Sequence, residues 1–340
     1  MRRLARALAR CLGLGALALL AACGAPEAGP AGQDGSRAAD GSAHLPYARL
    51  EVQAGRRSVR FDDGTRCVLP AATRRIASTL PNLTELVAHL GGVERLVGVS
   101  PHCNFPPGLE RLPRVSVMPL DLEGLRALAP DLVLCDRVFH AASLEALGRA
   151  GVPWLALQSR SLDDLEDTVQ LLGAVLEEEP AAQAARAPAE SPAARAAALV
   201  ARLRAARERV RPPAGAVGPA VLVVGQADPL HVLGPGSLLD DMLRACGARN
   251  VAADLGRPSG PFSEEALLAR APGWILTTWG ALPEAQRQRW ARVPALAQGH
   301  VAEAVADDLL RAGPRTPQAL ERLGEVLAGR LPPAALAGGR

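Results

Sequence analysis

The 340-residue chain contains no lysine, so arginine supplies all of its non-histidine basic side chains. Aromatic residues make up only 3% of the sequence, and Tyr47 is the one tyrosine. The sequence also lacks a G-x-S-x-G nucleophile motif, an H-E-x-x-H zinc motif and a Gly-rich phosphate loop. Familiar hydrolase, zinc-protease and nucleotide-binding sites are therefore not expected, and few aromatic rings are available to line a ligand site.

The first 22 residues are typical of a secretory signal peptide. Four arginines precede an apolar run, Cys11 to Leu20, that is too short to span a bilayer. The following Leu20-Ala21-Ala22-Cys23 resembles a bacterial lipobox, which predicts cleavage before Cys23 and lipidation of that residue. Several acyl chains on one cysteine give stable anchoring. The protein is thus expected to be exported and held at a membrane by its lipid.

The charge of the mature chain is close to balanced. Without the four arginines of the signal peptide, 34 basic residues face 35 acidic ones. No basic stripe of the kind that binds nucleic acid is present. We therefore expect no nucleic-acid partner.

Four cysteines follow Cys23. In an exported protein such residues lie in an oxidising compartment and can form disulfides. No C-x-x-C or Cys/His zinc spacing occurs among them. The sequence leaves their pairing open; they are Cys67, Cys103, Cys135 and Cys246.

Strands and helices alternate on both sides of a Pro/Ala-rich break at residues 179–192, which predicts two α/β lobes with parallel sheets. A small polar tether at residues 23–46 is followed by a first lobe, with a leader hairpin, over 47–178. A linker and one long helix occupy 179–211, with Ser191 as N-cap and Pro192 in the first turn. A second lobe covers 212–331. Such an architecture is two Rossmann-like lobes joined by one stiff helix, with a cleft between them.

Three further helix starts are indicated by capping residues. Asn82 with Glu85 and Ser161 with Asp164 have capping-box spacing, and Asp121 precedes a third helix.

One helix–Pro–strand unit occurs twice. Residues 122–134 read LEGLRALAPDLVL and residues 264–276 read EEALLARAPGWIL, with Glu123 aligned to Glu265 and Pro130 to Pro272. Each glutamate falls in the first turn of a predicted helix, where the helix dipole favours a carboxylate. A helix-starting glutamate needs no partner, so a purely structural role for both residues stays open.

The ordered set of segments resembles bacterial substrate-binding lipoproteins of ABC importers for vitamin B12, ferric siderophores and heme. The resemblance covers about residues 59–329 and rests on FDDGTRCVLP, RRIASTLPNLTELVAHLGGVERLVGVSPHCNFPP, LPRVSVMPLDLEGLRALAPDLVL, DPLHVLGPGSLLDDMLRACGARNVA and FSEEALLARAPGWILTT. It implies a non-enzymatic, monomeric carrier that captures a metal chelate and delivers it to a permease dimer with its ATPase. Glu123 and Glu265 match the two rim glutamates that dock on the permease subunits in this family.

The same resemblance, with the rule that loops after parallel strands line the crevice, gives the candidate ligand contacts. His102 and Phe105 stand where relatives usually carry Tyr, and His231 stands where an aromatic is common. The two histidines, one from each lobe, can clamp a metal centre or can simply hydrogen-bond their own loops. The remaining candidates provide apolar or polar contacts: Met118, Phe139, Phe262, Trp279, Asp307 and Arg311.

The predicted residues favour a corrinoid such as vitamin B12 as cargo. Tyr47 lies in the leader, so a tyrosinate ligand for heme iron is not expected. A bulky, amide-rich corrinoid with little net charge suits a modestly polar cleft. A ferric siderophore or heme remains the alternative cargo, and the protein needs no cofactor of its own. Two other classes stay open: a tetrapyrrole chelatase-like enzyme, in which Asp228 would assist His231, and a structural lipoprotein without ligand.

Overall fold

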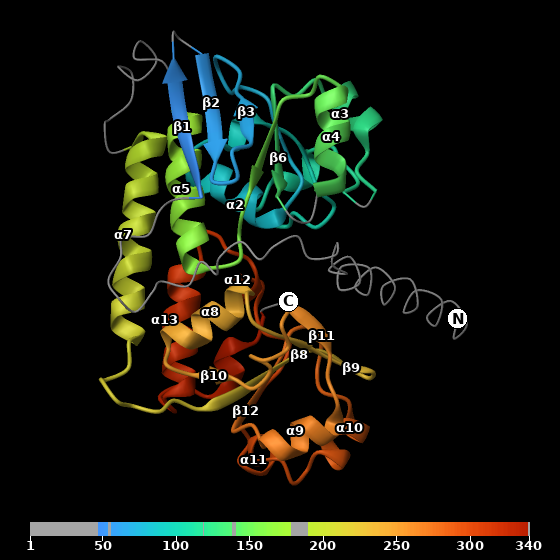
Figure 1. Ribbon diagram of the computed structural model, residues 1–340, viewed down its shortest axis with the longest axis vertical. Coiled ribbons are helices and arrows are strands. Elements are labelled where there is room, and N and C mark those ends of the chain that lie inside the picture. Colours follow the sequence, from blue (N-terminus) through green and yellow to red (C-terminus); the bar gives the residue numbers. More distant parts are fainter. Residues whose placement is uncertain (1–46, 54–55, 118, 138–140, 178–189, 339–340) are drawn as a thin grey trace, which may run out of the picture.

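The structure is a computed structural model that describes residues 47–53, 56–117, 119–137, 141–177 and 190–338. Two α/β lobes lie one above the other, and one long helix, α7 (Pro192–Val210), runs along one side of both (Figure 1). The two-lobe fold expected from the sequence is confirmed. The signal peptide, the whole tether with Cys23, and most of the linker before α7 lie outside the described residues.

The first lobe opens with the expected leader hairpin. Its three antiparallel strands are β1 (Ala48–Gln53), β2 (Arg56–Phe61) and β3 (Arg66–Val68). Tyr47 anchors the hairpin: its buried hydroxyl lies 2.7 Å from Thr168 Oγ1 and accepts the Gln158 N–H at 3.1 Å. Burial is the main reason that the pKa of Tyr47 is raised. Tyr47 thus has a structural role in fixing the hairpin to α5 and the end of β7.

Behind the hairpin lies a parallel sheet in the order β5-β4-β6-β7. Its strands are short and apolar, as expected for a sheet that is buried on both faces. They are β4 (Ile76–Ser78), β5 (Leu96–Val99), β6 (Leu132–Asp136) and β7 (Trp154–Leu157). The helices of this lobe are α2 (Pro81–His89), η1 (Val93–Arg95), η2 (Leu109–Arg111), α3 (Leu122–Ala127), α4 (Ala141–Arg149) and α5 (Leu162–Leu176).

The second sheet has the order β11-β9-β8-β12-β13, with β10 also paired to β8. It is mixed, because β9 runs antiparallel to both β8 and β11, whereas the sequence predicts parallel strands only. Its strands are β8 (Ala220–Ala227), β9 (Leu230–Leu233), β10 (Arg249–Asn250), β11 (Ser259–Pro261), β12 (Trp274–Thr277) and β13 (Val301–Ala302). Its helices are α8 (Leu238–Ala245), α9 (Glu264–Arg270), α10 (Glu284–Arg289), α11 (Pro294–Ala297), α12 (Asp307–Leu310), α13 (Thr316–Leu327) and η4 (Pro333–Leu336).

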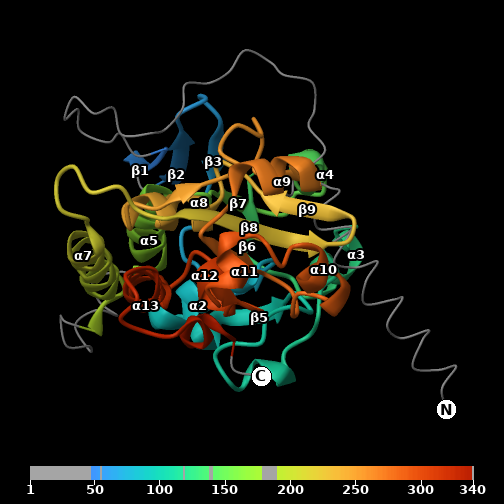
Figure 2. The same ribbon diagram turned by 90° about the horizontal axis from the view of Figure 1, so that it is seen from below.

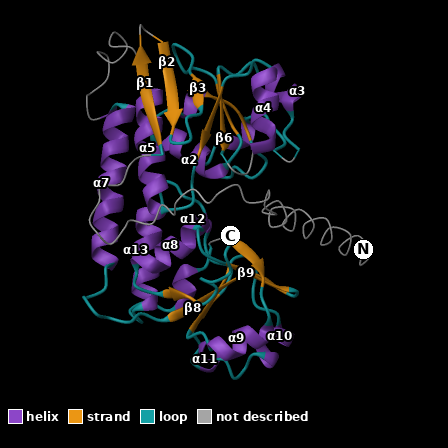
Figure 3. Cartoon of the chain, viewed as in Figure 1, coloured by secondary structure: helices purple, strands orange, loops and turns teal. Residues whose placement is uncertain are grey.

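Helix α7 begins as predicted and is fixed to both lobes. The Ser191 hydroxyl accepts the Ala194 N–H at 3.1 Å, and Pro192 occupies the first turn. Arg204 of α7 pairs with Glu166 of α5 at 2.9 Å, and Arg209 pairs with Glu321 of α13. Helices α5, α7 and α13 form a layer along one side of the molecule (Figure 3).

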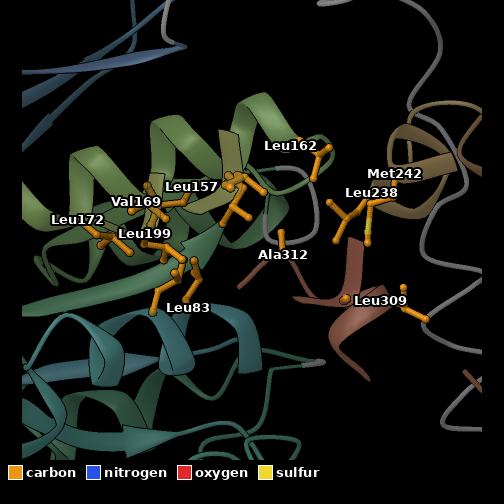
Figure 4. Close-up of a cluster of buried hydrophobic side chains, with 14 of the residues drawn as sticks. Leu83, Leu157, Leu162, Val169, Leu172, Leu199, Leu238, Met242, Leu309 and Ala312 are labelled. Atoms are coloured by element: carbon orange, nitrogen blue, oxygen red, sulfur yellow. The ribbon is translucent and has the colours of Figure 1, made fainter. Parts of the chain in front are cut away.

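The two lobes share one apolar core. Leu162 and Leu172 of the first lobe and Leu238, Met242 and Leu309 of the second belong to the same cluster of buried side chains (Figure 4). The Leu162 N–H also donates to Asp241 Oδ2 of the second lobe at 2.8 Å. A continuous core and a continuous helix both oppose a wide opening of the lobes.

The contact between α5 and α7 leaves no room for a side chain at Gly173. A Cβ there would lie 2.6 Å from the Ala196 Cβ. We expect Gly173→Ala to destabilise the protein by about 1–2 kcal/mol, because overpacking outweighs the gain in helix propensity. Chemical denaturation measures this effect. The matched control is Gly148→Ala in α4, where only the Trp154 ring nitrogen lies nearby at 3.8 Å; equal or higher stability is expected there, and an equal loss at both positions would contradict the packing argument.

Candidate functional site

The lobes meet through five polar residues and one phenylalanine on facing loops and helix ends, a group that we call the inter-lobe site. The first lobe contributes Glu85, Asn104 and Phe105, and the second contributes Asp307, Arg311 and Arg315. These residues lie after strands β4, β5 and β13, where the loops of an open α/β sheet form ligand sites. The arrangement brings together residues that are about 200 positions apart in the chain.

Arg315 and Glu85 form the strongest contact of this site. Arg315 Nε donates to Glu85 Oε2 at 3.0 Å, and its Nη2 donates to Oε1 at 2.8 Å. The Glu85 side chain is only 1% exposed. The guanidinium carbon of Arg315 also lies 4.7 Å from the centroid of the Phe105 ring. A forked ion pair and a cation–π contact therefore join the two lobes here.

Arg311, a predicted ligand contact, is also engaged. Its Nη1 donates to Asn104 Oδ1 at 2.7 Å and lies 3.6 Å from Glu85 Oε1. Its Nη2 lies 3.0 Å from Asp307 Oδ2, so the two predicted polar contacts form an ion pair with each other.

The electrostatics of the site follow from these contacts. Burial alone lowers the pKa of Arg315, but the hydrogen bonds with Glu85 and the charges of Glu85, Asp308 and Asp307 raise it overall. Asp308 has its own partner, Arg322, at 2.7 Å. Two guanidiniums and two carboxylates thus balance within the inter-lobe site.

The other predicted apolar contacts differ in how available they are to a ligand. Phe105 and Trp279 are 39% and 51% exposed as whole residues, and His102 is exposed in the turn after β5. Phe262 packs against the second lobe's own core cluster, with the Arg270 guanidinium carbon 5.1 Å from its ring centroid. Met118 and Phe139 lie outside the described residues.

His231 lies in β9, opposite Gln226 of β8 and Pro261 of β11. Its Nε2 is buried without a hydrogen-bond partner among the described residues. Burial, with a smaller contribution from the charge of Arg257, lowers the pKa of His231. A neutral imidazole with a free nitrogen can act as a metal ligand, and no described carboxylate holds it as a catalytic base would require.

The two copies of the repeated unit fold in the same way. Asp121 Oδ1 caps α3 by accepting the Gly124 N–H at 2.8 Å, and Ser263 Oγ caps α9 at the aligned position by accepting the Ala266 N–H at 3.0 Å. Each helix is followed by an alanine with left-handed φ, 43° at Ala129 and 44° at Ala271, ahead of the aligned prolines.

Glu123 and Glu265 therefore occupy the same position, the second residue after the cap. Both are exposed, and neither forms an ion pair with a described residue. The adjacent Glu264 differs, since it pairs with Arg289 at 2.8 Å. Helices α3 and α9 lie at opposite ends of the molecule, both on the side away from α7 (Figures 1 and 2).

The expected cap of α2 is wrong. The helix begins at Pro81 with no side-chain cap at Leu80. Asn82 instead donates to Ser159 Oγ at 2.9 Å, and Glu85 binds Arg315. Sequence reasoning thus missed Glu85, Asn104 and Arg315 as a group, and the one available signal was a glutamate on a largely apolar helix.

Other features of the described residues add no second site. No group of three or more His, Cys, Asp or Glu side chains among them is placed to hold a metal ion, and none of their helices has the length and apolar character needed to cross a membrane. A hollow on the leader hairpin, lined by Gln53, Arg56, Arg57, Ser58, Arg66, Val68, Leu69 and Ala71, includes none of the predicted ligand residues. All four cysteines after Cys23 are free thiols.

Comparison with known proteins gives a consistent family match. The sequence model described as periplasmic binding protein matches residues 76–307. An uncharacterised ABC transporter substrate-binding lipoprotein of Bacillus subtilis is 25% identical, over 92% of this chain and 94% of its own. A vitamin B12-binding protein of Pectobacterium carotovorum is 29% identical over 61% of this chain and 71% of its own.

Solved structures with the same fold include two whose ligands are named. The periplasmic vitamin B12 binding protein of Vibrio cholerae has a TM-score of 0.64 and 25% identity, and covers 76% of this chain and 98% of its own. A periplasmic heme-binding protein of Roseiflexus has a TM-score of 0.60 and 27% identity, over 76% of this chain and 99% of its own.

Proposed function

Because the chain belongs to the periplasmic binding protein family, a family of solute-binding proteins, we propose that it is the substrate-binding component of an ABC importer for a metal chelate. The observation that carries this proposal is the pair Glu123 and Glu265. Two carboxylates at equivalent positions, one on each lobe and neither in an ion pair with a described residue, match a partner with two equivalent subunits. A permease dimer with its ATPase is such a partner.

The cargo that we favour is a corrinoid of the vitamin B12 type. The inter-lobe site combines the exposed apolar ring of Phe105 with a charge-balanced set of polar groups, and the second lobe carries a further exposed ring, Trp279, just after β12. Few polar anchors and a large apolar contact are what a bulky amide-rich chelate requires. The vitamin B12-binding relatives support this choice.

Heme is the second candidate, favoured by one observation in particular. The Nε2 of His231 has no hydrogen-bond partner among the described residues, and a heme-binding protein is among the similar structures. Because this nitrogen is buried, the imidazole would have to turn outward to bind iron. If heme is the cargo, His231→Gln should remove the histidine-ligated Soret spectrum of the complex. An unchanged spectrum in that variant would exclude His231 as the ligand.

Incubation of the full chain with cyanocobalamin, heme and a ferric tris-catecholate, followed by gel filtration, tests the proposed function. We expect the cobalamin absorbance to elute with the protein at a molar ratio near one. We expect bound chelate to quench the fluorescence of Trp279. Replacement of this residue in Trp279→Ala should weaken binding by about tenfold. The control is Val217→Ala, an exposed position in the second lobe. Retention of none of the three chelates would overturn the proposal and favour a ligand-free structural role.

The same proposal covers signal-peptide cleavage, lipidation and the tether that joins the lipid to the lobes. Residues 1–22 are removed, Cys23 carries the lipid, and residues 23–46 tether the folded lobes to the membrane on its outer side. The lipoprotein named among the relatives supports this assignment.

A further inference from the structure

The inter-lobe site contains two arginines that an anionic ligand would need, and both already face an internal carboxylate. Arg315 makes a two-pronged contact with Glu85, and Arg311 lies 3.6 Å from the same group. Glu85 is almost completely buried, so water does not weaken its attraction to either guanidinium as it would at the surface. Neither arginine is free to act as an unopposed positive charge.

A second carboxylate completes the balance. Asp307 holds the other side of Arg311 at 3.0 Å and is 46% exposed. Arg257, near His231, makes no ion pair with a described residue, but it is exposed and solvent screens its charge. The buried part of the site therefore offers polar groups without net positive charge.

We infer that Glu85 determines the charge preference of the inter-lobe site, by neutralising Arg311 and Arg315 so that chelates of little net charge are preferred over anionic ones. This inference rests on the proposed chelate-binding function and adds to it a specificity-determining residue. Glu85 itself need not touch the ligand, since it acts through the two arginines. An anionic chelate would have to compete with Glu85 for each guanidinium, whereas an amide-rich chelate can use Asn104 and Asp307 as they stand.

The experiment measures tryptophan quenching of the full chain by cyanocobalamin and by a ferric tris-catecholate, for the wild type and for Glu85→Gln. We expect the variant to bind the anionic complex at least about tenfold more tightly, because a buried negative charge that opposes both arginines is removed. Its affinity for cyanocobalamin should change by less than about threefold. Asp307→Asn should act in the same direction with a smaller effect, because Asp307 is partly screened.

Two further variants identify charge as the cause. Glu85→Gln combined with Arg315→Gln restores the balance and should return the anion affinity to about that of the wild type. Glu208→Gln on α7, an exposed residue paired with Arg211, makes the same change of net charge away from the site and should have no effect.

The outcomes separate this inference from the function on which it rests. If the wild type binds a chelate but neither Glu85→Gln nor Asp307→Asn changes the preference between the two, the inference is overturned and the carrier function stands. If neither the wild type nor any variant binds a chelate, both fall. Should Glu85→Gln fail to fold, as judged by circular dichroism, Asp307→Asn decides alone.

Discussion

Import of the chelate should fall by at least about 100-fold when Glu123 and Glu265 are both replaced by arginine, while chelate binding stays at the wild-type level. A close pair of opposite charges at an interface is worth about 2 kcal/mol or more, about 30-fold in affinity, and reversing one charge of the pair adds repulsion. Both residues are exposed and unpaired with described residues, so folding should not suffer. Uptake of labelled cyanocobalamin through the organism's own permease and ATPase measures the effect.

The controls use the same chemical change elsewhere. Glu208→Arg reverses a charge on α7, on the opposite side of the molecule, and should transport normally (Figure 1). Each single variant removes one of two contacts and should give an intermediate loss. Uptake by the double variant at more than half of the wild-type rate would mean that these glutamates only stabilise their helices.

The location of these glutamates was predictable because it depends on local sequence. Residues 122–134 and 264–276 contain the cap, the helix, the left-handed alanine and the proline in one short segment, and both copies fold as their spacing indicates. Which surface each glutamate faces depends on the fold as a whole. The family resemblance alone predicts a docking surface at these residues, and that surface stays a prediction.

Two capping-box patterns in the first lobe show where local reasoning ends. Ser161 and Asp164 form the expected box, with the serine accepting the Asp164 N–H at 3.0 Å. Asn82 and Glu85 have the same spacing but do not, because the first helical position is taken by Pro81 and because tertiary partners hold both side chains. The partner of Glu85 is 230 positions away, and no spacing rule reaches that far.

The antiparallel strands of the second lobe were missed for a similar reason. Strand β9 has only four residues and follows β8 through the turn at Asp228-Pro229. Its pattern is too short to distinguish a hairpin from a loop. Its consequence for the site is that His231 is placed by strand pairing, with Nε2 buried, instead of by a flexible loop.

The shared core predicts that Leu162→Ala lowers the stability of both lobes together, by about 2–5 kcal/mol. Leu162 is fully buried at the boundary between the lobes, near Leu238 and Met242 of the second (Figure 4). Removal of a buried leucine side chain costs its transfer free energy and leaves a cavity. Because the apolar cluster runs through both lobes, the loss is expected to spread to both in one cooperative transition.

Two probes compare the unfolding of the second lobe with that of the whole molecule. Trp154 lies in the first lobe and the other three tryptophans in the second, so fluorescence of a Trp154→Phe background reports the second lobe, whereas far-ultraviolet circular dichroism reports both. We expect the two denaturation curves to coincide, and Leu162→Ala to move them by the same amount. Leu268→Ala, at a position that is 51% exposed in α9, should change the free energy of unfolding by no more than about 0.5 kcal/mol. The shared-core argument is contradicted if Leu162→Ala leaves the fluorescence midpoint unchanged while the circular dichroism curve splits into two transitions. Such a result would show that the lobes unfold independently. Helix α7 alone would then resist opening of the lobes.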